Sequence, residues 1–442
     1  MSINRRQFMR RAAGAVSTAA VMGVAGSQRV AGQEQALPAP EASGIEHVVV
    51  VMMENRSFDH LLGWLPGANG TQAGLSYVDN SGEAHATHRL STFVGCSHPD
   101  PDHSYAGGRS EYDDGKMDGW LRTSTNDAFS IGYYEEADLP FYAALARNFT
   151  TLDNYFASIL SSTFPNRVFQ HAAQTDRLSN TLDLSTLPTI WDSLAVAGVS
   201  HKYYYSNVPF LALWGPKYLG ISALFPEFLA DAAAGTLPAV SFLDPRFTIL
   251  DDGFGNDDHP HADLRAGEAF LGQVYRALTS GPAWPNTVLI VNRDEWGGFY
   301  DTVVPPRVIA PNYVDTDLIE GNALLGCRVP TIVVSPFTRS SNPAVPRINS
   351  SLYDHTSVLK FIEWRYNLPP LTSRDASDEI ANLALALNFA APNLTVPALP
   401  VIHMPFPSLC GLFELGSTVD NESYDFYNLL VSDLAAEWKK LT

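Results

Sequence analysis

The residues of this sequence that are best suited to chemistry follow two apolar segments. Glu54 and Asn55 come directly after the first segment, and Asp294 and Glu295 come shortly after the second. Carboxylate and amide oxygens are the ligands that hard divalent cations such as Mg²⁺, Ca²⁺ and Mn²⁺ prefer, and they suit Zn²⁺ less well. These four residues therefore predict a site for one divalent metal ion.

The two apolar segments, His47–Met53 and residues 287–292, have the composition of buried β-strands. Both are rich in β-branched residues and are too short to span a membrane. In open α/β sheets, ligands bind beyond the carboxyl ends of the strands. We therefore expect each strand to carry one half of the same site.

A hydroxyl group lies at the predicted start of a helix, in the stretch Ser-Ser-Thr-Phe-Pro-Asn-Arg at 161–167. Pro165 suits the first helical turn, and Thr163 lies at or near the N-cap. A helix N-terminus favours a phosphate group, and a metal-bound hydroxyl can lose its proton to become a nucleophile. Thr163 is thus a candidate nucleophile, with a simple N-cap as the alternative. Two positions are possible for Arg167. It could hold a phosphate or the nucleophile loop, or it could lie on the surface of the helix.

A histidine could complete this chemistry, because a protonated imidazole can supply a proton to a leaving group. His259 lies in the loop Asp-Asp-His-Pro before the amphipathic stretch 262–279. The two aspartates of that loop, Asp257 and Asp258, are most simply interpreted as solvated loop charges. The combination of metal ligands, hydroxyl and histidine predicts metal-assisted phosphoryl transfer.

The composition limits the size of the fold and the class of partner. The chain has 442 residues, 45% of them hydrophobic, which suffices for one large α/β domain or two smaller ones. Its net charge of -19 argues against nonspecific nucleic-acid binding and against polybasic attachment to a membrane surface. Cys96, Cys327 and Cys410 lack zinc-site spacing, so either one disulfide with a free thiol or buried thiols would fit.

The N-terminus resembles a Tat export signal. Arg5 and Arg6 precede Phe8 and a run of small residues at 12–25, with cleavage expected around residues 25–33. A disordered basic tail is the alternative. We predict residues 1–43 to be a signal peptide and disordered leader, and residues 44–442 to be one catalytic domain. The protein would be exported by the Tat machinery to the periplasm or the medium, with no membrane span in the mature chain.

Strand-like and helical segments alternate along the chain. Further strands are predicted at 200–205, 239–243 and 329–335, and helices at 139–148, 190–197, 262–279, 354–366 and 422–441. This alternation predicts an α/β fold with a mostly parallel central sheet and helices on both faces. The long segment 95–120 is rich in Tyr, Trp and His and predicts a lid or pocket wall.

Six motifs, in order along the chain, resemble the bacterial phosphoesterase family of phospholipases C and acid phosphatases, part of the alkaline-phosphatase-like superfamily. They are Glu-Asn-Arg-Ser-Phe-Asp-His (54–60), Asp-Pro-Asp-His-Ser (100–104), Thr-x-Pro-Asn-Arg (163–167), Asp-Asp-His-Pro (257–260), Asp-Glu-x-Gly-Gly-Phe-Tyr-Asp (294–301) and Asp-His-Thr-Ser (354–357). The resemblance covers about residues 44–366 and implies an alkaline-phosphatase-like fold. One departure is Trp296, which occupies a position where the family commonly carries His.

The resemblance also implies roles for individual residues. Glu54, Asn55, Asp294 and Glu295 would bind the metal, and Thr163 would be both a metal ligand and the nucleophile. In addition, His103 and His259 would bind the phosphate or protonate the leaving group, and His355 would bind the substrate. From its place in the helix after Thr163, we also predict that Arg167 binds the substrate. A structural use for His355, in capping a helix, is the alternative.

These roles predict an exported, metal-dependent hydrolase of phosphoric esters. We expect a phospholipase C-type phosphodiesterase with a threonine nucleophile, acting on a phosphate ester that could be a phospholipid. The alternatives are an acid phosphatase acting on monoesters and, from another class, a non-catalytic exported binding protein. A sulfatase is disfavoured, because that reaction needs Cys or Ser where this chain has Thr163.

Overall fold

An eight-stranded sheet forms the centre of the computed structural model, which describes residues 37–250, 252–407 and 421–440. The strand order is β14-β6-β13-β10-β1-β9-β7-β8. In that order the strands are Arg347–Asn349, Thr150–Leu152, Thr331–Val334, Thr287–Arg293, His47–Met53, Val240–Leu243, His201–Tyr205 and Ser222–Leu224. Only β13 pairs antiparallel with its neighbours, so the predicted mostly parallel α/β sheet is confirmed.

The central strand β1 is buried on both faces. Val48 and Val50 point into one apolar core, and Val49 and Val51 point into the other. A strand covered on both sides has no polar face, which explains its uninterrupted run of valines. The neighbouring strand β10 runs parallel to it, with Met53 opposite Arg293, so the two strands end at the same level.

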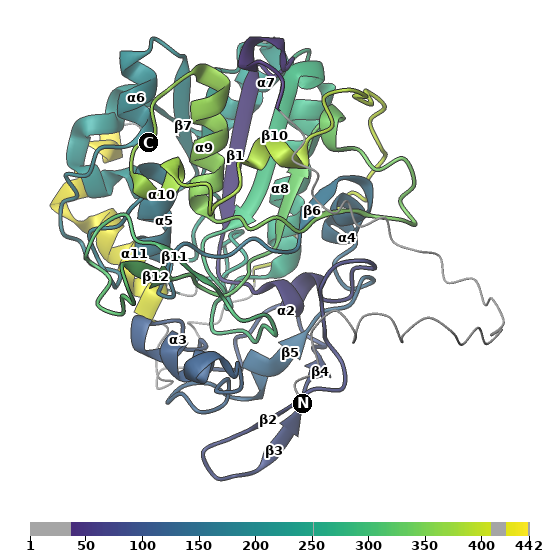
Figure 1. Ribbon diagram of the computed structural model, residues 1–442, viewed down its shortest axis with the longest axis vertical. Coiled ribbons are helices and arrows are strands. Elements are labelled where there is room, and N and C mark those ends of the chain that lie inside the picture. The colour runs from purple at the N-terminus through teal and green to yellow at the C-terminus, as the bar shows by residue number, and fades with distance from the viewer. Residues whose placement is uncertain (1–36, 251, 408–420, 441–442) are drawn as a thin grey trace, which may run out of the picture.

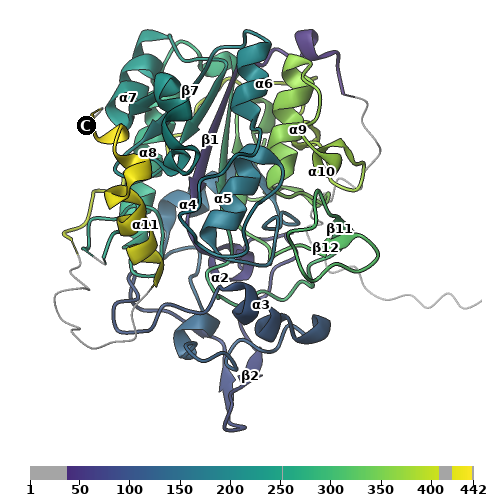
Figure 2. The same ribbon diagram turned by 90° about the vertical axis from the view of Figure 1, so that its left-hand side faces the viewer.

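Helices cover both faces of the sheet (Figures 1 and 2). The first core contains residues of α5 (Thr163–Ala172), α6 (Ile190–Val196), α9 (His355–Tyr366) and α11 (Asn421–Val431). The second core contains residues of α4 (Pro140–Asn148), α7 (Phe225–Ala234) and α8 (Leu264–Ser280). The predicted helices are confirmed except at the C-terminus.

The predicted helix at 422–441 is too long. Helix α11 ends at Val431, and two 3₁₀ turns follow at Asp433–Ala435 and Trp438–Lys440. Ser432 adopts an extended conformation and starts the first of these turns. Serine favours such N-cap positions over helix interiors, which explains the break.

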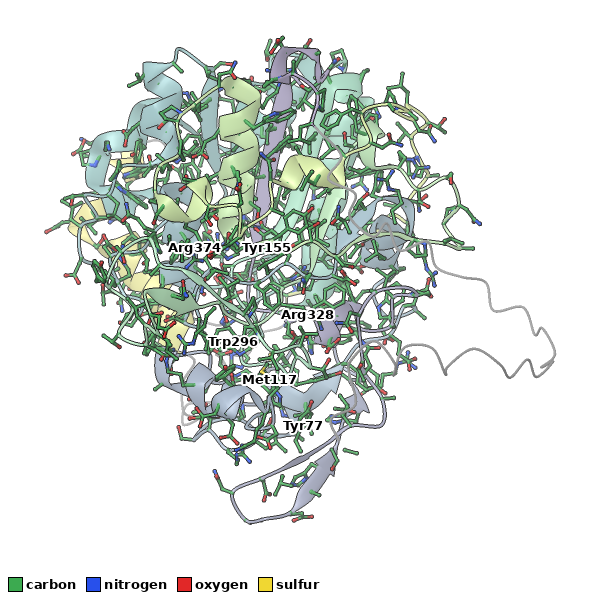
Figure 3. The ribbon with its side chains drawn as sticks, viewed as in Figure 1. Tyr77, Met117, Tyr155, Trp296, Arg328 and Arg374 are labelled. Carbon is green, nitrogen blue, oxygen red and sulfur yellow. The ribbon has the colours of Figure 1, made fainter. Side chains whose placement is uncertain are left out.

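The segment 95–120 lies at the carboxyl edge of the sheet, where a pocket wall was expected (Figure 1). It contains α3 (Tyr105–Tyr112), whose N-cap Ser104 accepts a hydrogen bond from the amide of Gly107 at 3.0 Å. The short helix α2 (Phe58–Leu62) and the hairpin of β2 (Ser76–Val78) and β3 (Ala84–Ala86) lie at the same end. A third apolar cluster joins this region to the loop after β10 and includes Tyr77, Met117 and Trp296 (Figure 3).

The predicted export signal falls mainly on residues 1–36, outside the described residues. Within residues 37–43, Pro40–Ala42 forms a 3₁₀ turn. Among the described helices, none is both long and apolar enough to cross a bilayer. Cys327 is a buried free thiol, and Cys96 is disulfide-bonded.

Candidate active site

The ends of β1 and β10 bring the predicted metal ligands together. The amide of Asn55 donates to Oδ1 of Asp294 at 3.1 Å, and the amide of Glu295 donates to the same oxygen at 2.8 Å. Glu54, Asn55, Asp294 and Glu295 are all fully buried. Asn55 has a φ of 42°, in the left-handed region that asparagine tolerates better than most residues. Both halves of the predicted site therefore meet at the carboxyl edge of the sheet.

Thr163 is the first residue of α5 and points its hydroxyl at the end of β1. Its Oγ1 lies 3.4 Å from Oε2 of Glu54 and 3.3 Å from Oδ1 of Asn55. The N-cap of α5 is Ser162, and the amide of Phe164 donates to the side chain of Asn180. The alternative of Thr163 as a simple N-cap is therefore wrong, and its hydroxyl is directed at the predicted metal ligands.

Arg167 lies one helical turn after Thr163 and is only 2% exposed, so the surface position considered for it is wrong. Its guanidinium forms ion pairs with Glu54, with Asp244 at 3.1 Å and with Asp294 at 3.5 Å. Burial alone would lower the pKa of Arg167, but these three carboxylates raise it above its ordinary value. Arg167 therefore stays charged and holds the strand ends against α5.

Three carboxylates against one guanidinium give this buried group a formal charge of -2. Burial raises the pKa of Asp244 to about 6, a shift that the Arg167 guanidinium opposes. Buried charge of one sign is costly unless a counter-charge balances it. Carboxylate, amide and hydroxyl oxygens of this kind suit a hard divalent cation, so the residues present fit the predicted metal.

His103 and His259 form a second group, centred on Asp100. Oδ2 of Asp100 lies 3.9 Å from Nδ1 of His103 and 3.8 Å from Nε2 of His259. Nδ1 of His103 also lies 2.8 Å from the carbonyl oxygen of Pro101. Two imidazoles placed on one carboxylate could bind a phosphate or pass a proton to a leaving group.

The loop that carries His259 is tied to the residues after β1. The guanidinium of Arg56 donates from Nε to the carbonyl of Asp258 at 2.7 Å and from Nη2 to that of His259 at 3.1 Å. The amide of Glu54 donates to the carbonyl of Asp257 at 2.7 Å. These contacts fix His259 relative to the predicted metal ligands.

The interpretation of Asp257 and Asp258 as solvated charges is wrong. Both are buried. Asp257 accepts hydrogen bonds from Thr248 and from the amide of His259, and Asp258 pairs with Arg293 at 2.6 Å. Asp257 is held by nearby residues of the same loop, whereas Asp258 pairs with Arg293 at the end of β10, a partner that the local sequence does not indicate.

His355 contacts the backbone of Asp294 after β10. Its Nε2 is 2.6 Å from the carbonyl oxygen of Asp294, and its Nδ1 is 3.2 Å from the hydroxyl of Tyr155. Burial lowers the pKa of His355 to about 4, so its imidazole is neutral at pH 7. In this geometry it holds the loop after β10 in place, and a role in substrate binding stays a prediction.

Sequence reasoning missed two carboxylates of this site. Asp244 is the first residue after β9, so the rule that singled out Glu54 after β1 would also have selected it. Asp100 belongs to the Asp-Pro-Asp-His-Ser motif but was not assigned a role. Only the folded chain shows that Asp100 lies between two histidines that are far apart in sequence.

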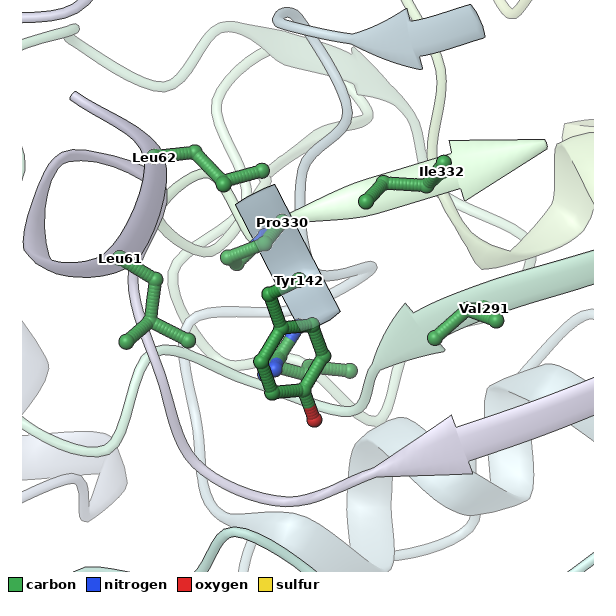
Figure 4. Close-up of a pocket in the computed structure, with 7 residues that line it drawn as sticks. Leu61, Leu62, Tyr142, Val291, Pro330 and Ile332 are labelled. Carbon is green, nitrogen blue, oxygen red and sulfur yellow. The ribbon is translucent and has the colours of Figure 1, made fainter. Parts of the chain in front are cut away.

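An enclosed apolar hollow lies near this region but is no substrate site (Figure 4). Its lining consists of Leu61, Leu62, Tyr142, Val291, Arg293, Pro330 and Ile332. It has no room for a water molecule, so it is a packing defect beside the Asp258–Arg293 pair.

Comparisons with known proteins match the motifs. The Phosphoesterase family matches residues 45–369. Phospholipase C B of Mycobacterium tuberculosis is 32% identical, over 95% of this chain and 91% of that protein. Non-specific phospholipase C1 of Arabidopsis thaliana is 34% identical, over 75% of this chain and 69% of that protein.

Similar solved structures are more distant. A phosphonate monoester hydrolase of Agrobacterium radiobacter overlaps 78% of each chain with a TM-score of 0.37 and 10% identity. A protein of the alkaline phosphatase superfamily from Vibrio parahaemolyticus overlaps 77% of this chain and 69% of its own, with a TM-score of 0.36 and 10% identity. These overlaps are too weak to bear on the site. The family match and the identity to curated relatives suffice, however, and the chain belongs to the Phosphoesterase family and is a hydrolase of phosphoric ester bonds.

Proposed function

We propose that this protein is an exported, metal-dependent phosphodiesterase of the phospholipase C type, with Thr163 as the nucleophile. The observation that carries the proposal is the position of Thr163. Its hydroxyl lies at the N-terminus of α5 and within 3.4 Å of oxygens of both Glu54 and Asn55. A helix N-terminus attracts the phosphate, and the adjacent oxygens suit a cation that would stabilise the threonine alkoxide.

The residues of the chain would divide the reaction as follows. Oγ1 of Thr163, after its hydroxyl proton has passed to solvent, forms a bond to phosphorus, and the bond from phosphorus to the leaving alcohol breaks. An imidazolium of the Asp100 group, His103 or His259, gives its proton to the departing alkoxide. The phosphothreonine is then hydrolysed by water, whose proton returns to the same imidazole. Glu54, Asn55, Thr163, Asp294 and Glu295 would hold the metal ion, which when bound neutralises negative charge on the phosphate.

The choice of a diester substrate is supported by the relatives, since the proteins at 32–34% identity are phospholipases C. Export is supported by the twin arginine at the N-terminus and by the disulfide bond at Cys96. Disulfides persist mainly in oxidising compartments such as the periplasm and the medium.

The test compares Thr163→Ala and Thr163→Ser with the wild type on three substrates. Phosphatidylcholine and p-nitrophenyl phosphorylcholine report diesterase activity, and p-nitrophenyl phosphate reports phosphatase activity. We expect diester turnover by the wild type, a loss of at least about 10³-fold in kcat for Thr163→Ala, and partial activity for Thr163→Ser, which keeps the hydroxyl. Wild-type turnover in Thr163→Ala would exclude the nucleophile. Preference for the monoester would identify an acid phosphatase instead.

A further inference from the structure

The loop after β10 makes a buried contact with the pocket wall through Trp296. The indole Nε1–H of Trp296 donates to Oε2 of Glu111 at 2.8 Å. Both side chains are fully buried, and Glu111 belongs to α3. Figure 3 shows Trp296 between the sheet edge and the region of Met117 and Tyr77. Burial raises the pKa of the Glu111 carboxyl group well above its ordinary value. A buried polar group without hydrogen-bond partners is costly, so loss of these contacts would destabilise this arrangement.

The hydrogen bonds continue from Glu111 to the segment that carries His103. Oε1 of Glu111 accepts from Nδ2 of Asn126 at 2.8 Å, and Oδ1 of Asn126 accepts from the amide of Asp102 at 2.6 Å. Asp102 stands directly before His103. A continuous chain of three hydrogen bonds therefore joins Trp296, next to Glu295, to the histidine group.

Steric contacts join the same two segments independently of these hydrogen bonds. Gly298 has a φ of 68°, and a Cβ there would lie 2.6 Å from Cβ of Pro101. A Cβ at Gly108 of α3 would lie 2.8 Å from the ring of Trp296. Contacts this close leave no room for a side chain, so the loop after β10, Pro101 and α3 are packed in one fixed arrangement.

We propose that Glu111 and Asn126 are positioning residues that hold His103 and Asp100 at a fixed place relative to Asp294 and Glu295. The inference rests on the proposed function, because it assigns these residues to the alignment of the two halves of that site. They act through the amide of Asp102 and the indole of Trp296, without touching the substrate. Misplacement of a catalytic group by about 1 Å can cost on the order of 100-fold in rate.

The main variant is Asn126→Ala, which removes both the donor to Glu111 and the acceptor for Asp102. We expect kcat/KM for p-nitrophenyl phosphorylcholine to fall by about 10–100-fold and the pH profile of kcat/KM to shift, because the environment of His103 changes. Asn382→Ala is the matched control. Asn126 donates to the backbone carbonyl of Trp120 at 2.8 Å as well as to Glu111. Asn382 likewise donates to a backbone carbonyl, that of Lys360, and accepts from a backbone amide, that of Ala384, but it lies outside the site. We expect it to keep the wild-type rate and pH profile.

A second variant, Trp296→Phe, keeps an aromatic ring at this position but removes the N–H donor and the ring atoms that pack against Gly108. If one hydrogen-bonded chain transmits the effect, the loss in the double variant Trp296→Phe/Asn126→Ala will be smaller than the product of the two single losses. A folded Asn126→Ala protein with the wild-type kcat/KM and pH profile would overturn the inference, as would fully multiplicative losses.

Binding of inorganic phosphate, measured by calorimetry, separates this inference from the proposed function. We expect Asn126→Ala to bind phosphate at least about tenfold more weakly than wild type and Asn382→Ala to bind it equally well. If the wild type fails to cleave diesters, the proposed function fails, and a lower phosphate affinity in Asn126→Ala would still support the positioning role. Equal phosphate affinity in Asn126→Ala and in wild type would overturn the positioning role.

Discussion

Replacement of Arg167 by Met would test the charge balance of the site. Methionine keeps most of the side-chain volume and removes the positive charge from a position that is 2% exposed. Glu54, Asp244 and Asp294 would then lie together without their shared guanidinium, and the formal charge of the group would change from -2 to -3. Removal of one partner from a buried ion pair costs about 3–5 kcal/mol, so we expect a loss of this size in metal-free buffer.

This loss can be measured as a shift in melting temperature. An unfolding entropy of about 2.1 cal/mol/K per residue gives about 0.8 kcal/mol/K for a domain of roughly 400 residues, so the expected decrease in melting temperature is about 4–6 °C in EDTA. A saturating divalent metal should restore more stability to Arg167→Met than to wild type, because a site with greater negative charge binds a cation more tightly. Scanning calorimetry with EDTA, Ca²⁺, Mg²⁺ and Mn²⁺ would measure both effects.

Arg328→Met is the matched control. Arg328 is equally buried and pairs with Asp301 at 2.7 Å and Asp59 at 3.2 Å, neither of which is a predicted metal ligand. The Arg328→Met variant should show a similar decrease in melting temperature, and that decrease should be the same with and without metal. An unchanged melting temperature for Arg167→Met in EDTA would refute the account of the buried charges. Equal stabilisation of all three proteins by metal would refute the link between Arg167 and the cation site.

Two further predictions concern the metal and a buried carboxyl. Chelation should abolish phosphodiesterase turnover, and adding back Ca²⁺, Mg²⁺ or Mn²⁺ should restore it better than Zn²⁺; full activity after exhaustive chelation would exclude the metal. Burial raises the pKa of Glu268 from 4.5 to about 8, while its Oε1 accepts the amides of Phe141 and Tyr142 at the start of α4. As the pH rises, Glu268 loses its proton at a lower pH in the unfolded chain than in the folded protein. Its burial therefore lowers the free energy of unfolding progressively between about pH 4.5 and 8. Glu268→Gln keeps the acceptor oxygen but cannot ionise. Its gain in unfolding free energy over wild type, measured by urea unfolding, should reach at most about 3 kcal/mol at pH 7 and fall to zero near pH 4. A constant difference across this pH range would contradict the pKa shift.

The sequence by itself determined the elements that carry the site. The valine run of β1 and the polar residues directly after it are local features, and periodicity together with strand-end position was enough to select Glu54 and Asp294. The start of α5 at Thr163 also follows from local signals, namely Ser162 and Pro165 around it. The family resemblance rests on the same local motifs.

Only the tertiary structure decided which of these loops meet. Arg167 contacts carboxylates that follow three different strands, and Asp100 lies between histidines more than 150 positions apart in the sequence. Asp258 has the sequence context of an exposed loop residue but is buried and pairs with Arg293, which belongs to another segment. Such partnerships depend on the order of strands in the sheet and on the path of the loops over its edge. Spacing along the chain does not encode these features, because contacts between distant segments are fixed only when the whole core packs.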